Sequence, residues 1–510
     1  MPHVVTQSCV GDGSCVYACP VNCIQPTPDD PAFEHAEMLH IDPAACVDCG
    51  ACVTACPVDA IKPHRLLDAG ERAFLAANAA YHRTPRSRPL LAPVRPRLRV
   101  REHERPLRVA IVGSGPAAIY AADELLTIPR AQVSVYERLP VPYGLVRAGV
   151  APDHRRTRRI ARQLDRVCAD PRLRLRLGVE VGRDVTREQL LASHDAVVYA
   201  VGAAADRRLE IPGATLPGTA SATEFVAWYN GHPDHAGRSF DLSHRRAVIV
   251  GNGNVALDVA RILTVDPESL AGTAIAPAAL AALRASRVEE VVVVGRRGPA
   301  ASAFTLPELI GLSATPGVGL AVADDARAGL ARGGDPKLEL LRGLPPARDG
   351  ARGITLRWGL TPARIEGAER VTGITFAPTS AAVAAAASDA ATADAAATAD
   401  AAADPAAGRA LTTLDAGLVI SAIGYRGLPI AGMPFDAASG TIPSADGRVL
   451  DAAGGAAIPG LYVAGWIKRG PTGFIGTNKS CSQDTVRALV DDFNAGLLRP
   501  AADPAPHRSA

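Results

Sequence analysis

The segment CVDCGACVTACP, residues 46–57, places four cysteines in the spacing C-x2-C-x2-C-x3-C, followed by proline. Thiolates in this spacing hold cubane iron–sulfur clusters in bacterial proteins. An earlier segment, CVGDGSCVYACP at residues 9–20, repeats the frame but carries Asp12 where the second cysteine would stand. The two runs together predict a module with two iron–sulfur clusters at the start of the chain.

In two-cluster modules the last cysteine of each run ligates the other cluster, which divides the ligands into two sets. The complete set predicts a [4Fe-4S] cluster and consists of Cys19, Cys46, Cys49 and Cys52. The second set has only three thiolates, from Cys9, Cys15 and Cys56. It predicts either a [3Fe-4S] cluster or a [4Fe-4S] cluster whose fourth iron takes the Asp12 carboxylate or water.

Disulfides and structural zinc are the competing uses of cysteines that cluster in a sequence. Two runs of ligands that both end in Cys-Pro argue against these uses. Cys23 falls outside the repeated frame, and we expect it to be a free thiol.

Charge is unevenly distributed along the 510 residues, although the net charge is only +2. The chain has no Lys or Arg before Lys62, so the cysteine-rich module is acidic, whereas arginines crowd residues 83–101 and 155–162. Opposite charges on two parts of one chain predict that they dock. The competing interpretation is a soluble linker and a solvated helix face. Nucleic-acid binding fits less well, because the acidic module would repel phosphates.

The N-terminal residues lack the charged and apolar regions of a signal peptide, and the chain has no run of about 18 apolar residues. We therefore expect no membrane span and a cytoplasmic protein. Clusters held by thiolates also need a reducing compartment during assembly, which agrees with this expectation.

A dinucleotide-binding motif follows an apolar strand predicted at residues 107–112. The sequence GSGPAA at residues 113–118 opens a predicted helix that runs to residue 126. Gly113 permits the tight turn, Gly115 lets the backbone approach a pyrophosphate, and the helix N-terminus favours that anion. The next predicted strand ends at Glu137, where a carboxylate can accept hydrogen bonds from a ribose.

A second motif of the same kind, GNGNVA at residues 251–256, follows a predicted strand at 247–250. The next predicted strand, 291–294, ends in Gly295-Arg296-Arg297 and not in an acid. Guanidinium groups at this place can grip a 2′-phosphate, which favours NADP(H) over NAD(H). The long interval between motif and arginines requires an insertion near residues 264–288. The competing interpretation is that the arginines only cap a surface strand.

Five runs carry a resemblance to a known family. They are VAIVGSGPAAIYAADELL (109–126), PVPYGLVRAGVAPDH (140–154), GNGNVALDVARIL (251–263), VVGRRGPA (293–300) with AFTLPEL (303–309), and GLYVAGWIKRGPTGFIGTNK (460–479). Across residues 107–495 the chain resembles the adrenodoxin reductase type of ferredoxin–NADP reductase. Residues 1–62 resemble bacterial seven-iron or eight-iron ferredoxins, and the fusion is similar to the two-part ferredoxin/ferredoxin–NADP reductases of mycobacteria.

The resemblance implies an α+β bacterial-type ferredoxin domain followed by a two-domain α/β reductase of the Rossmann-like, glutathione reductase type. The expected parts are a ferredoxin domain at 1–62, a Pro- and Arg-rich linker at 63–106, a split FAD-binding domain at 107–205 and 425–498, and an inserted NADP-binding domain at 206–424. Composition predicts a low-complexity insertion at 379–407 and a disordered tail at 499–510.

The family's binding residues carry over to this chain position by position. FAD is expected to contact Gly113, Gly115, Ala117, Glu137, Leu145, Val181, Trp466, Gly473, Phe474 and Ile475. NADP(H) is expected to contact Arg207, Asn252, Gly253, Asn254, Val255, Arg296, Arg297 and Glu308, with Gly473 beside the nicotinamide. His154 matches a family histidine near the flavin and joins Trp466 and Gly473 as a predicted catalytic residue. One departure is Ile310-Gly311, where close relatives often carry Arg-Glu.

The resemblance implies a ferredoxin–NADP(+) reductase, in which NADPH reduces FAD and single electrons pass reversibly through the fused clusters to an external ferredoxin or another one-electron acceptor. The alternatives are an electron-input unit like the small subunit of glutamate synthase and a redox-sensing protein. A disulfide reductase is disfavoured because no C-x2-C or C-x4-C pair lies near the flavin motifs. Cys168 and Cys481 are isolated, and we expect them to be buried.

Overall fold

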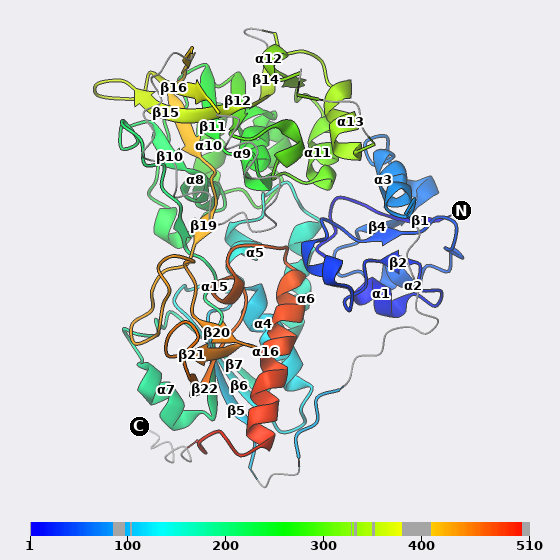
Figure 1. Ribbon diagram of the computed structural model, residues 1–510, viewed down its shortest axis with the longest axis vertical. Coiled ribbons are helices and arrows are strands. Elements are labelled where there is room, and N and C mark those ends of the chain that lie inside the picture. The colour runs from blue at the N-terminus through cyan, green and yellow to red at the C-terminus, as the bar shows by residue number, and fades with distance from the viewer. Residues whose placement is uncertain are drawn as a thin grey trace.

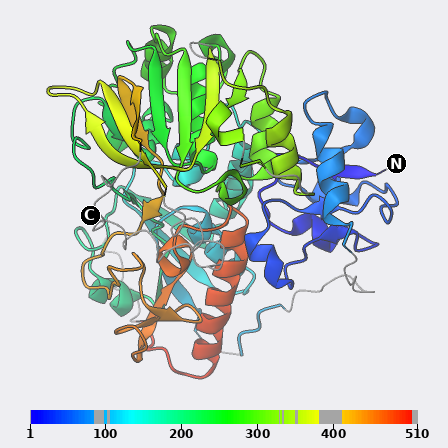
Figure 2. The ribbon, with the colours of Figure 1, turned by 45° about the horizontal axis from the view of Figure 1, so that its top comes forward.

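The computed structural model describes residues 2–84, 97–101, 105–327, 329–330, 334–348, 352–379 and 410–501. Figures 1 and 2 show three packed units: a cysteine-rich module in blue, a unit with a seven-stranded sheet, and a unit with a six-stranded sheet in green and yellow. Residues 380–407 of the expected insertion, 502–510 of the expected tail, and 85–96 and 102–104 of the expected linker lie outside the described residues. No helix among the described residues has the length and apolarity to cross a membrane.

The cysteine-rich module is built from one short unit that occurs twice. In each copy a strand leads into a cysteine loop and then into a short helix, α1 (Ser14–Ala18) or α2 (Ala51–Ala55). A glycine in the left-handed region precedes each helix, Gly13 with φ 72° and Gly50 with φ 77°, where other residues would be strained. The strands form two antiparallel pairs, β1 (His3–Val5) with β4 (Ile61–Pro63) and β2 (Ile24–Gln25) with β3 (His40–Ile41).

This module extends beyond the boundary expected at residue 62. Helix α3 (Ala73–Tyr81) packs on β1 and β3 and buries Phe74. Asn78 ties this helix to both strands: its Oδ1 accepts hydrogen bonds from the N–H groups of Val5 (3.2 Å) and Ile41 (3.0 Å), and its Nδ2 donates to the Val5 carbonyl (2.9 Å). The predicted linker therefore starts too early, because the boundary followed the cysteine frame and the alanine-rich helix has a weak apolar period.

The seven-stranded sheet has the order β20-β21-β22-β8-β5-β6-β7 and carries the first glycine motif. Its strands are β5 (Arg108–Val112), β6 (Gln132–Glu137), β7 (Leu173–Leu177), β8 (Ala196–Tyr199), β20 (Ser444–Ala445), β21 (Arg448–Leu450) and β22 (Ala457–Val463). Two distant parts of the chain thus complete one sheet. Its helices are α4 (Pro116–Leu126), α5 (Leu145–Ala148), α6 (Ala161–Cys168), α7 (Arg187–Ser193), α15 (Trp466–Arg469) and α16 (Thr477–Asn494). The long α16 packs along α4, as the red helix in Figure 1 shows.

The six-stranded sheet has the order β10-β18-β11-β12-β14-β13, with all neighbours parallel, and carries the second glycine motif. Its strands are β10 (Thr219–Ser221), β11 (Arg246–Val250), β12 (Glu290–Gly295), β13 (Leu320–Val322), β14 (Gly353–Trp358) and β18 (Leu418–Ser421). Its helices are α8 (Ala222–Tyr229), α9 (Asn254–Thr264), α10 (Pro277–Arg284), α11 (Leu306–Ser313), α12 (Asp324–Arg327) and α13 (Pro336–Gly343). Helix α10 is the insertion expected between residues 264 and 288.

A small antiparallel sheet and a crossing point complete the architecture. The small sheet consists of β15 (Leu360–Glu366), β16 (Gly373–Pro378) and β17 (Thr412–Asp415). The chain leaves the seven-stranded unit at β9 (Ala205–Asp206) and returns at β19 (Tyr425–Arg426). These two strands pair with each other, so both crossings between the units lie at one place.

Replacing Asn78 by Ala tests whether α3 belongs to the module. The substitution leaves the Val5 and Ile41 N–H groups buried without their acceptor, so we expect the module to lose about 2 kcal/mol of stability. Calorimetry of the whole protein would show this as a lower-temperature transition. Leu75→Ala, on the exposed side of the same helix, is the control and should shift the transition much less. An unchanged transition in Asn78→Ala would contradict the packing of α3 described above.

Candidate functional site: two cysteine sites and two dinucleotide motifs

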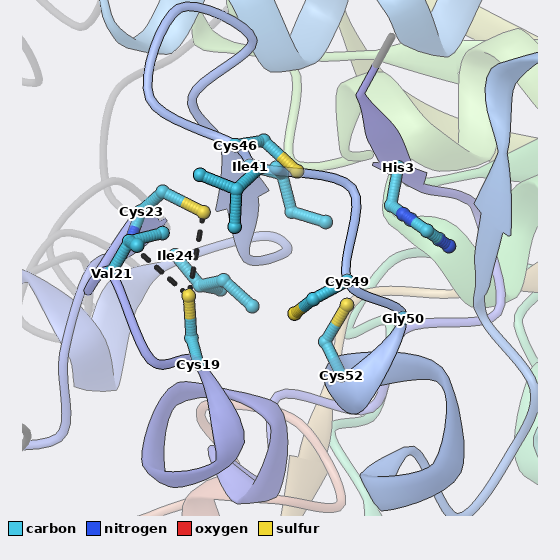
Figure 3. Close-up of a pocket in the computed structure, with 11 residues that line it drawn as sticks. His3, Cys19, Val21, Cys23, Ile24, Ile41, Cys46, Cys49, Gly50 and Cys52 are labelled. Carbon is cyan, nitrogen blue, oxygen red and sulfur yellow. Dashed lines mark hydrogen bonds between the residues drawn. The ribbon is translucent and has the colours of Figure 1, made fainter.

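The first cysteine site is a small pocket between the two cysteine loops. Figure 3 shows the four predicted ligands, Cys19, Cys46, Cys49 and Cys52, with their sulfurs around it. Burial, followed by the charges of the other thiols, raises the pKa of Cys52 to about 12. Binding of iron would remove this unfavourable repulsion between buried thiolates, because each thiol would exchange its proton for a bond to the metal.

Cys23 also lines this cavity, although the cysteine frame does not include it. Its Sγ lies 3.4 Å from that of Cys19, and it is 2% exposed. The hydrogen bond from Cys23, with backbone N–H groups that point at the same sulfur, lowers the pKa of Cys19 to about 5. The site therefore has a fifth thiol, which spacing alone could not reveal.

The second cysteine site brings together the other predicted set. Burial raises the pKa of Cys9 to about 12, with further contributions from the charges of Cys56 and Asp12. Burial also raises the pKa of Cys15, and Cys9 has the largest electrostatic effect on it. Cys9 and Cys56 pack against side chains of the seven-stranded unit, among them Ile119 on α4. This site therefore faces the seven-stranded unit.

Asp12, the odd member of the cysteine frame, is 8% exposed and already has partners. Its Oδ2 accepts a hydrogen bond from the Ser14 hydroxyl and lies 3.4 Å from the Lys479 ammonium on α16. The same ammonium donates to the Ser14 Oγ at 3.0 Å. The carboxylate is thus held by a hydroxyl and by a cation from the far end of the chain.

The first glycine motif has the shape that a pyrophosphate needs. Gly113 has φ 98°, and a Cβ there would lie 2.6 Å from the Ala200 carbonyl oxygen. Gly115 precedes α4, and a Cβ at this glycine would meet no atom within 4 Å of the described chain, so the backbone is open to a ligand. The Glu137 carboxylate accepts hydrogen bonds from the Ser114 N–H (3.0 Å) and hydroxyl (2.6 Å). This carboxylate stands beside the turn, as expected for a ribose contact.

The other predicted FAD residues lie in the same seven-stranded unit. Gly465 approaches Ala117 closely, Leu145 begins α5 with 36% of its surface exposed, and Val181 makes an isolated bridge to Val185. An exposed leucine beside an open glycine turn suits a cofactor that would cover it. Trp466 begins α15, and its indole N–H donates to the Thr472 carbonyl (3.0 Å).

The segment 473–476 is where the seven-stranded unit contacts the second cysteine site. Gly473 has φ 78°, and the Phe474 N–H donates to the Thr477 hydroxyl (3.0 Å). The Gly476 N–H donates to the Val10 carbonyl of the cysteine loop at 2.7 Å. Ile475 packs in the same apolar cluster as Cys9 and Cys56. The predicted flavin segment and the loop of the second cysteine site are therefore in direct contact.

The second glycine motif repeats the open turn. Gly251 has φ 116°, and a Cβ on Gly253 would meet no atom within 4 Å of the described chain. The buried Asn252 Nδ2 has no hydrogen-bond partner among the described residues, as expected of a group that would donate to a bound ligand. Asn254 Oδ1 accepts from the Thr305 N–H (2.8 Å), and Val255 follows it in α9.

The predicted phosphate contacts lie at the ends of neighbouring elements. Arg296 and Arg297 directly follow β12, and both are half-buried. The Arg296 carbonyl accepts from the Thr379 hydroxyl (2.7 Å). Arg207 follows β9 at the crossing point, where its N–H donates to the Gly424 carbonyl (3.0 Å). The two arginines after β12 therefore lie at the end of the strand next to the second glycine motif, whereas Arg207 lies at the crossing point between the units.

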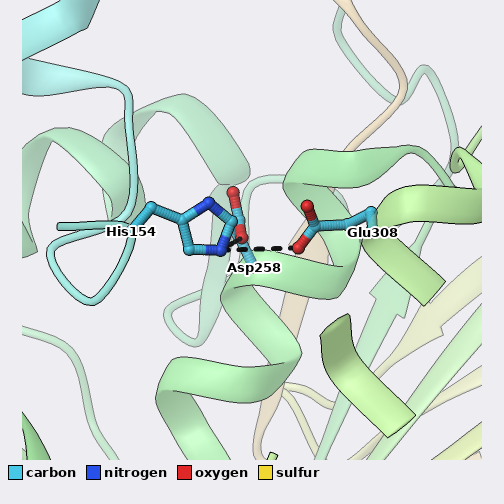
Figure 4. A group of neighbouring side chains, drawn as sticks. All are labelled: His154, Asp258 and Glu308. Carbon is cyan, nitrogen blue, oxygen red and sulfur yellow. Dashed lines mark ion pairs between the residues drawn. The ribbon is translucent and has the colours of Figure 1, made fainter. Parts of the chain in front are cut away.

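His154 belongs to a buried polar network that joins the seven-stranded and six-stranded units. The centre of the network is Arg261 on α9, which is 3% exposed and was not predicted from the sequence. It donates to Asp153 through two nitrogens (2.7 and 3.1 Å), to Asp258 (2.6 Å) and to Glu308 (3.0 Å), and one nitrogen lies 2.6 Å from His154 Nε2. Figure 4 shows His154 Nε2 between Asp258 and Glu308, 3.5 Å from each.

The spacing of His154, Asp258 and Glu308 would also suit a metal ion. The Arg261 guanidinium, however, already supplies a positive charge between the two carboxylates. Burial raises the pKa of Asp258 to about 6, although Arg261 opposes the shift. Burial would also raise the pKa of Asp153, but Arg261 more than compensates and lowers it. The network is thus a set of carboxylates organised by one arginine.

Comparison with known proteins identifies both parts of the chain. A family model described as 4Fe-4S dicluster domain matches residues 8–60, and one described as pyridine nucleotide-disulphide oxidoreductase matches residues 107–299. A probable ferredoxin/ferredoxin–NADP reductase of Mycobacterium tuberculosis (strain ATCC 25618 / H37Rv) is 54% identical over 524 residues, covering 99% of this chain and 86% of the relative. The chain belongs to the ferredoxin/ferredoxin–NADP reductase family.

Further similar proteins match about three quarters of this chain. The mitochondrial NADPH:adrenodoxin oxidoreductase of Homo sapiens is 41% identical over 409 residues, covering 78% of this chain and 80% of the relative. The solved structure of Mycobacterium tuberculosis FprA in complex with NADPH has a TM-score of 0.66 and 40% identity, covering 78% of this chain and 88% of that one. The predicted fold class and family are confirmed by these matches.

The ferredoxin module docks on both reductase units, as the charge pattern predicted. Arg156 pairs with Glu71 (2.8 Å), and Arg159 pairs with Asp59. The Leu306 N–H at the start of α11 donates to a Glu37 oxygen (2.8 Å). Both arginines belong to the basic stretch at residues 155–162. Cys481 is buried as expected, whereas Cys168 is only half-buried.

Changing Asp258 to Asn tests the network through the pH dependence of stability. Because its folded pKa of about 6 exceeds the ordinary value of 3.8, the folded protein binds this proton more tightly than the unfolded chain. Its contribution to stability is therefore full below pH 3.8 and falls as the pH rises to about 6. We expect the melting temperature of the wild type, relative to Asp258→Asn, to be higher at about pH 5 than at about pH 7.5.

Asp484→Asn is the matched control for this experiment, because Asp484 has an exposed carboxylate. Its melting-temperature difference from the wild type should stay nearly constant between the two pH values. A constant difference for Asp258→Asn as well would contradict the raised pKa and the burial of this carboxylate.

Proposed function

We propose that this chain is an NADPH-dependent reductase that delivers single electrons to an external ferredoxin or a similar one-electron acceptor, in the reaction of a ferredoxin–NADP(+) reductase. One observation carries the proposal: the loop of the second cysteine site is hydrogen-bonded through Val10 to Gly476, within the segment assigned to the flavin. Such a contact is needed where electrons must leave a flavin for a cluster. The names of the relatives agree with this reaction. A reducing compartment, and hence the cytoplasm, suits the thiolate sites.

The described residues fit both nucleotides. Residues 107–205 and 425–498 would hold FAD at the open Gly115 turn, and Glu137, Trp466 and Gly473–Ile475 are among the residues that would contact it. Residues 206–424 would hold NADP(H) at the Gly253 turn, and the unpartnered Asn252 amide supports this assignment. FAD supplies the conversion between a hydride and two single electrons. The contribution of this chain is to bind and orient the nucleotides and to keep water out.

The two cysteine sites differ in what they would hold. The first site, with its four predicted ligands around one cavity, suits a [4Fe-4S] cluster. The second site has three cysteines, and the Asp12 carboxylate is already engaged by Ser14 and Lys479. We therefore assign a [3Fe-4S] cluster to the second site, with Asp12 outside the ligand set.

The first site is also the one from which electrons would leave. Cys49 is exposed, and the neighbouring Val47 is 60% exposed. The second site, in contrast, is covered by α4 and the segment at Ile475. An external acceptor would therefore approach the protein beside Cys49.

Anaerobic reduction with NADPH tests the proposed function. We expect NADPH to bleach the flavin absorbance of the wild type and to support steady reduction of ferredoxin. Cys49→Ser should keep the flavin bleaching but lose about tenfold or more of the ferredoxin reduction, because removing a cluster ligand impairs the exit site. Cys168→Ser, outside both sites, should behave as the wild type. A protein whose flavin does not bleach with NADPH would refute the proposed function.

Electron paramagnetic resonance of the protein as isolated tests the second site. Asp12→Ala should keep the signal of an oxidised three-iron cluster, because the carboxylate is not a ligand in our assignment. Asp12→Cys should replace this signal with a four-iron cluster, because it completes the ligand frame. Absence of the three-iron signal from the wild type, together with its appearance in Asp12→Ala, would make Asp12 the ligand of a fourth iron and overturn the assignment.

A further inference from the structure

Helix α11 of the NADP unit packs against the ferredoxin module. Ile310 is 4% exposed and belongs to the apolar core of that module, together with Phe74 of α3. Gly311 lies inside the same helix, where glycine costs about 1 kcal/mol relative to alanine. Both residues therefore lie at the contact with this module.

The space above Gly311 is filled by the side chain of Gln7 from the ferredoxin module. A Cβ on Gly311 would overlap the Gln7 amide, so no larger residue fits without moving it. The Gln7 Nε2 donates a hydrogen bond to Glu308 Oε2 at 3.2 Å. Gly311 therefore leaves the space in which the Gln7 amide, a hydrogen-bond donor from another part of the chain, reaches Glu308.

Each of the two carboxylate oxygens of Glu308 accepts a hydrogen bond from a different part of the chain. Its Oε1 accepts from Arg261 (3.0 Å) and lies 3.5 Å from His154 Nε2, while its Oε2 accepts from Gln7. The residue is 7% exposed and stands in the first turn of α11, whose cap is Thr305. One carboxylate thus connects the ferredoxin module, the NADP unit and the loop of His154.

We propose that Gln7 is a positioning residue for the nicotinamide site, so that the docked ferredoxin module completes the binding site for NADP(H). This inference rests on the proposed binding of NADP(H) by residues 206–424, with Glu308 as one of the expected contacts. The start of α11 lies beside the second glycine motif, because the Thr305 N–H donates to Asn254 Oδ1 (2.8 Å). An amide is suited to the task because it fixes the orientation of the carboxylate without neutralising it. A lysine would cancel the charge, and an acid would repel it.

The dissociation constant of NADP+, measured from the change in flavin absorbance, tests this role. Gln7→Met keeps the length of the side chain but removes the donor, and Gly311→Ala displaces the amide from the reductase side. Both should raise the dissociation constant of NADP+ and the KM for NADPH about fivefold, because a hydrogen bond to a charged group is lost. The kcat with ferricyanide should change less than twofold, because Gln7 does not touch the reacting atoms.

A double-mutant cycle separates positioning from a general structural effect. In a Glu308→Gln background, Gln7→Met should no longer change the dissociation constant, because its effect passes through the carboxylate. Arg159→Ala removes an exposed ion pair of the same interface and should leave NADP+ binding unchanged. An equal effect of Gln7→Met in both backgrounds would overturn the proposal.

The iron content of each variant and the binding of NADP+ by the wild type distinguish a failure of this inference from a failure of the proposed function. Gln7 is two residues from Cys9, so the iron of each variant is counted, and Gly311→Ala carries the test if Gln7→Met loses iron. Unchanged NADP+ binding in Gly311→Ala with full iron content would refute the role of Gln7. Failure of the wild type to bind NADP+ would instead refute the proposed function on which this inference rests.

Discussion

The contact between the loop at Val10 and the turn at Gly476 is the constraint on which the arrangement depends. It is a backbone hydrogen bond of 2.7 Å, set among apolar side chains that include Ile475 and Cys56. Because both partners are backbone groups on tight glycine-rich turns, side chains cannot come between them. The two cysteine sites share interleaved ligands, so fixing one loop against the reductase also orients the other site toward solvent.

A second constraint comes from charge. Arg261 is almost fully buried and is surrounded by three carboxylates and His154. A buried guanidinium without its partners would be very costly, so the elements that supply these partners must stay together. They come from the loop at residues 153–154, from α9 and from α11, which belong to different units. The network therefore sets how the two dinucleotide motifs face each other, whereas the exposed pairs at Arg156 and Arg159 contribute little energy.

The family resemblance predicted the fold class, whereas spacing and local pattern predicted both glycine motifs and the division of the cysteines into two sets. These pattern signals are short-range, because a cysteine frame or a strand-turn-helix motif extends over about 20 residues. The roles of Gln7, Arg261 and Lys479 could not be predicted, since their partners lie far away in the sequence. Gln7 meets Glu308 across 301 positions, and Lys479 meets Asp12 across 467. The sequence indicated only a helical turn near residues 69–80, and the packing of this helix on the module could not be predicted because the partners of Asn78 are also remote.

The ferredoxin module also restrains movement between the reductase units. It touches the seven-stranded unit at Gly476 and the six-stranded unit at Glu308 and Leu306. Among the described residues, the chain crosses between these two units at the paired strands β9 and β19. A rotation about that crossing would have to break one set of contacts with the module. Because the module is covalently attached, its docking is helped by a high effective concentration. The relative orientation of the nucleotide sites and the seating of the module are therefore stabilised together, and either should be weakened when the other is lost.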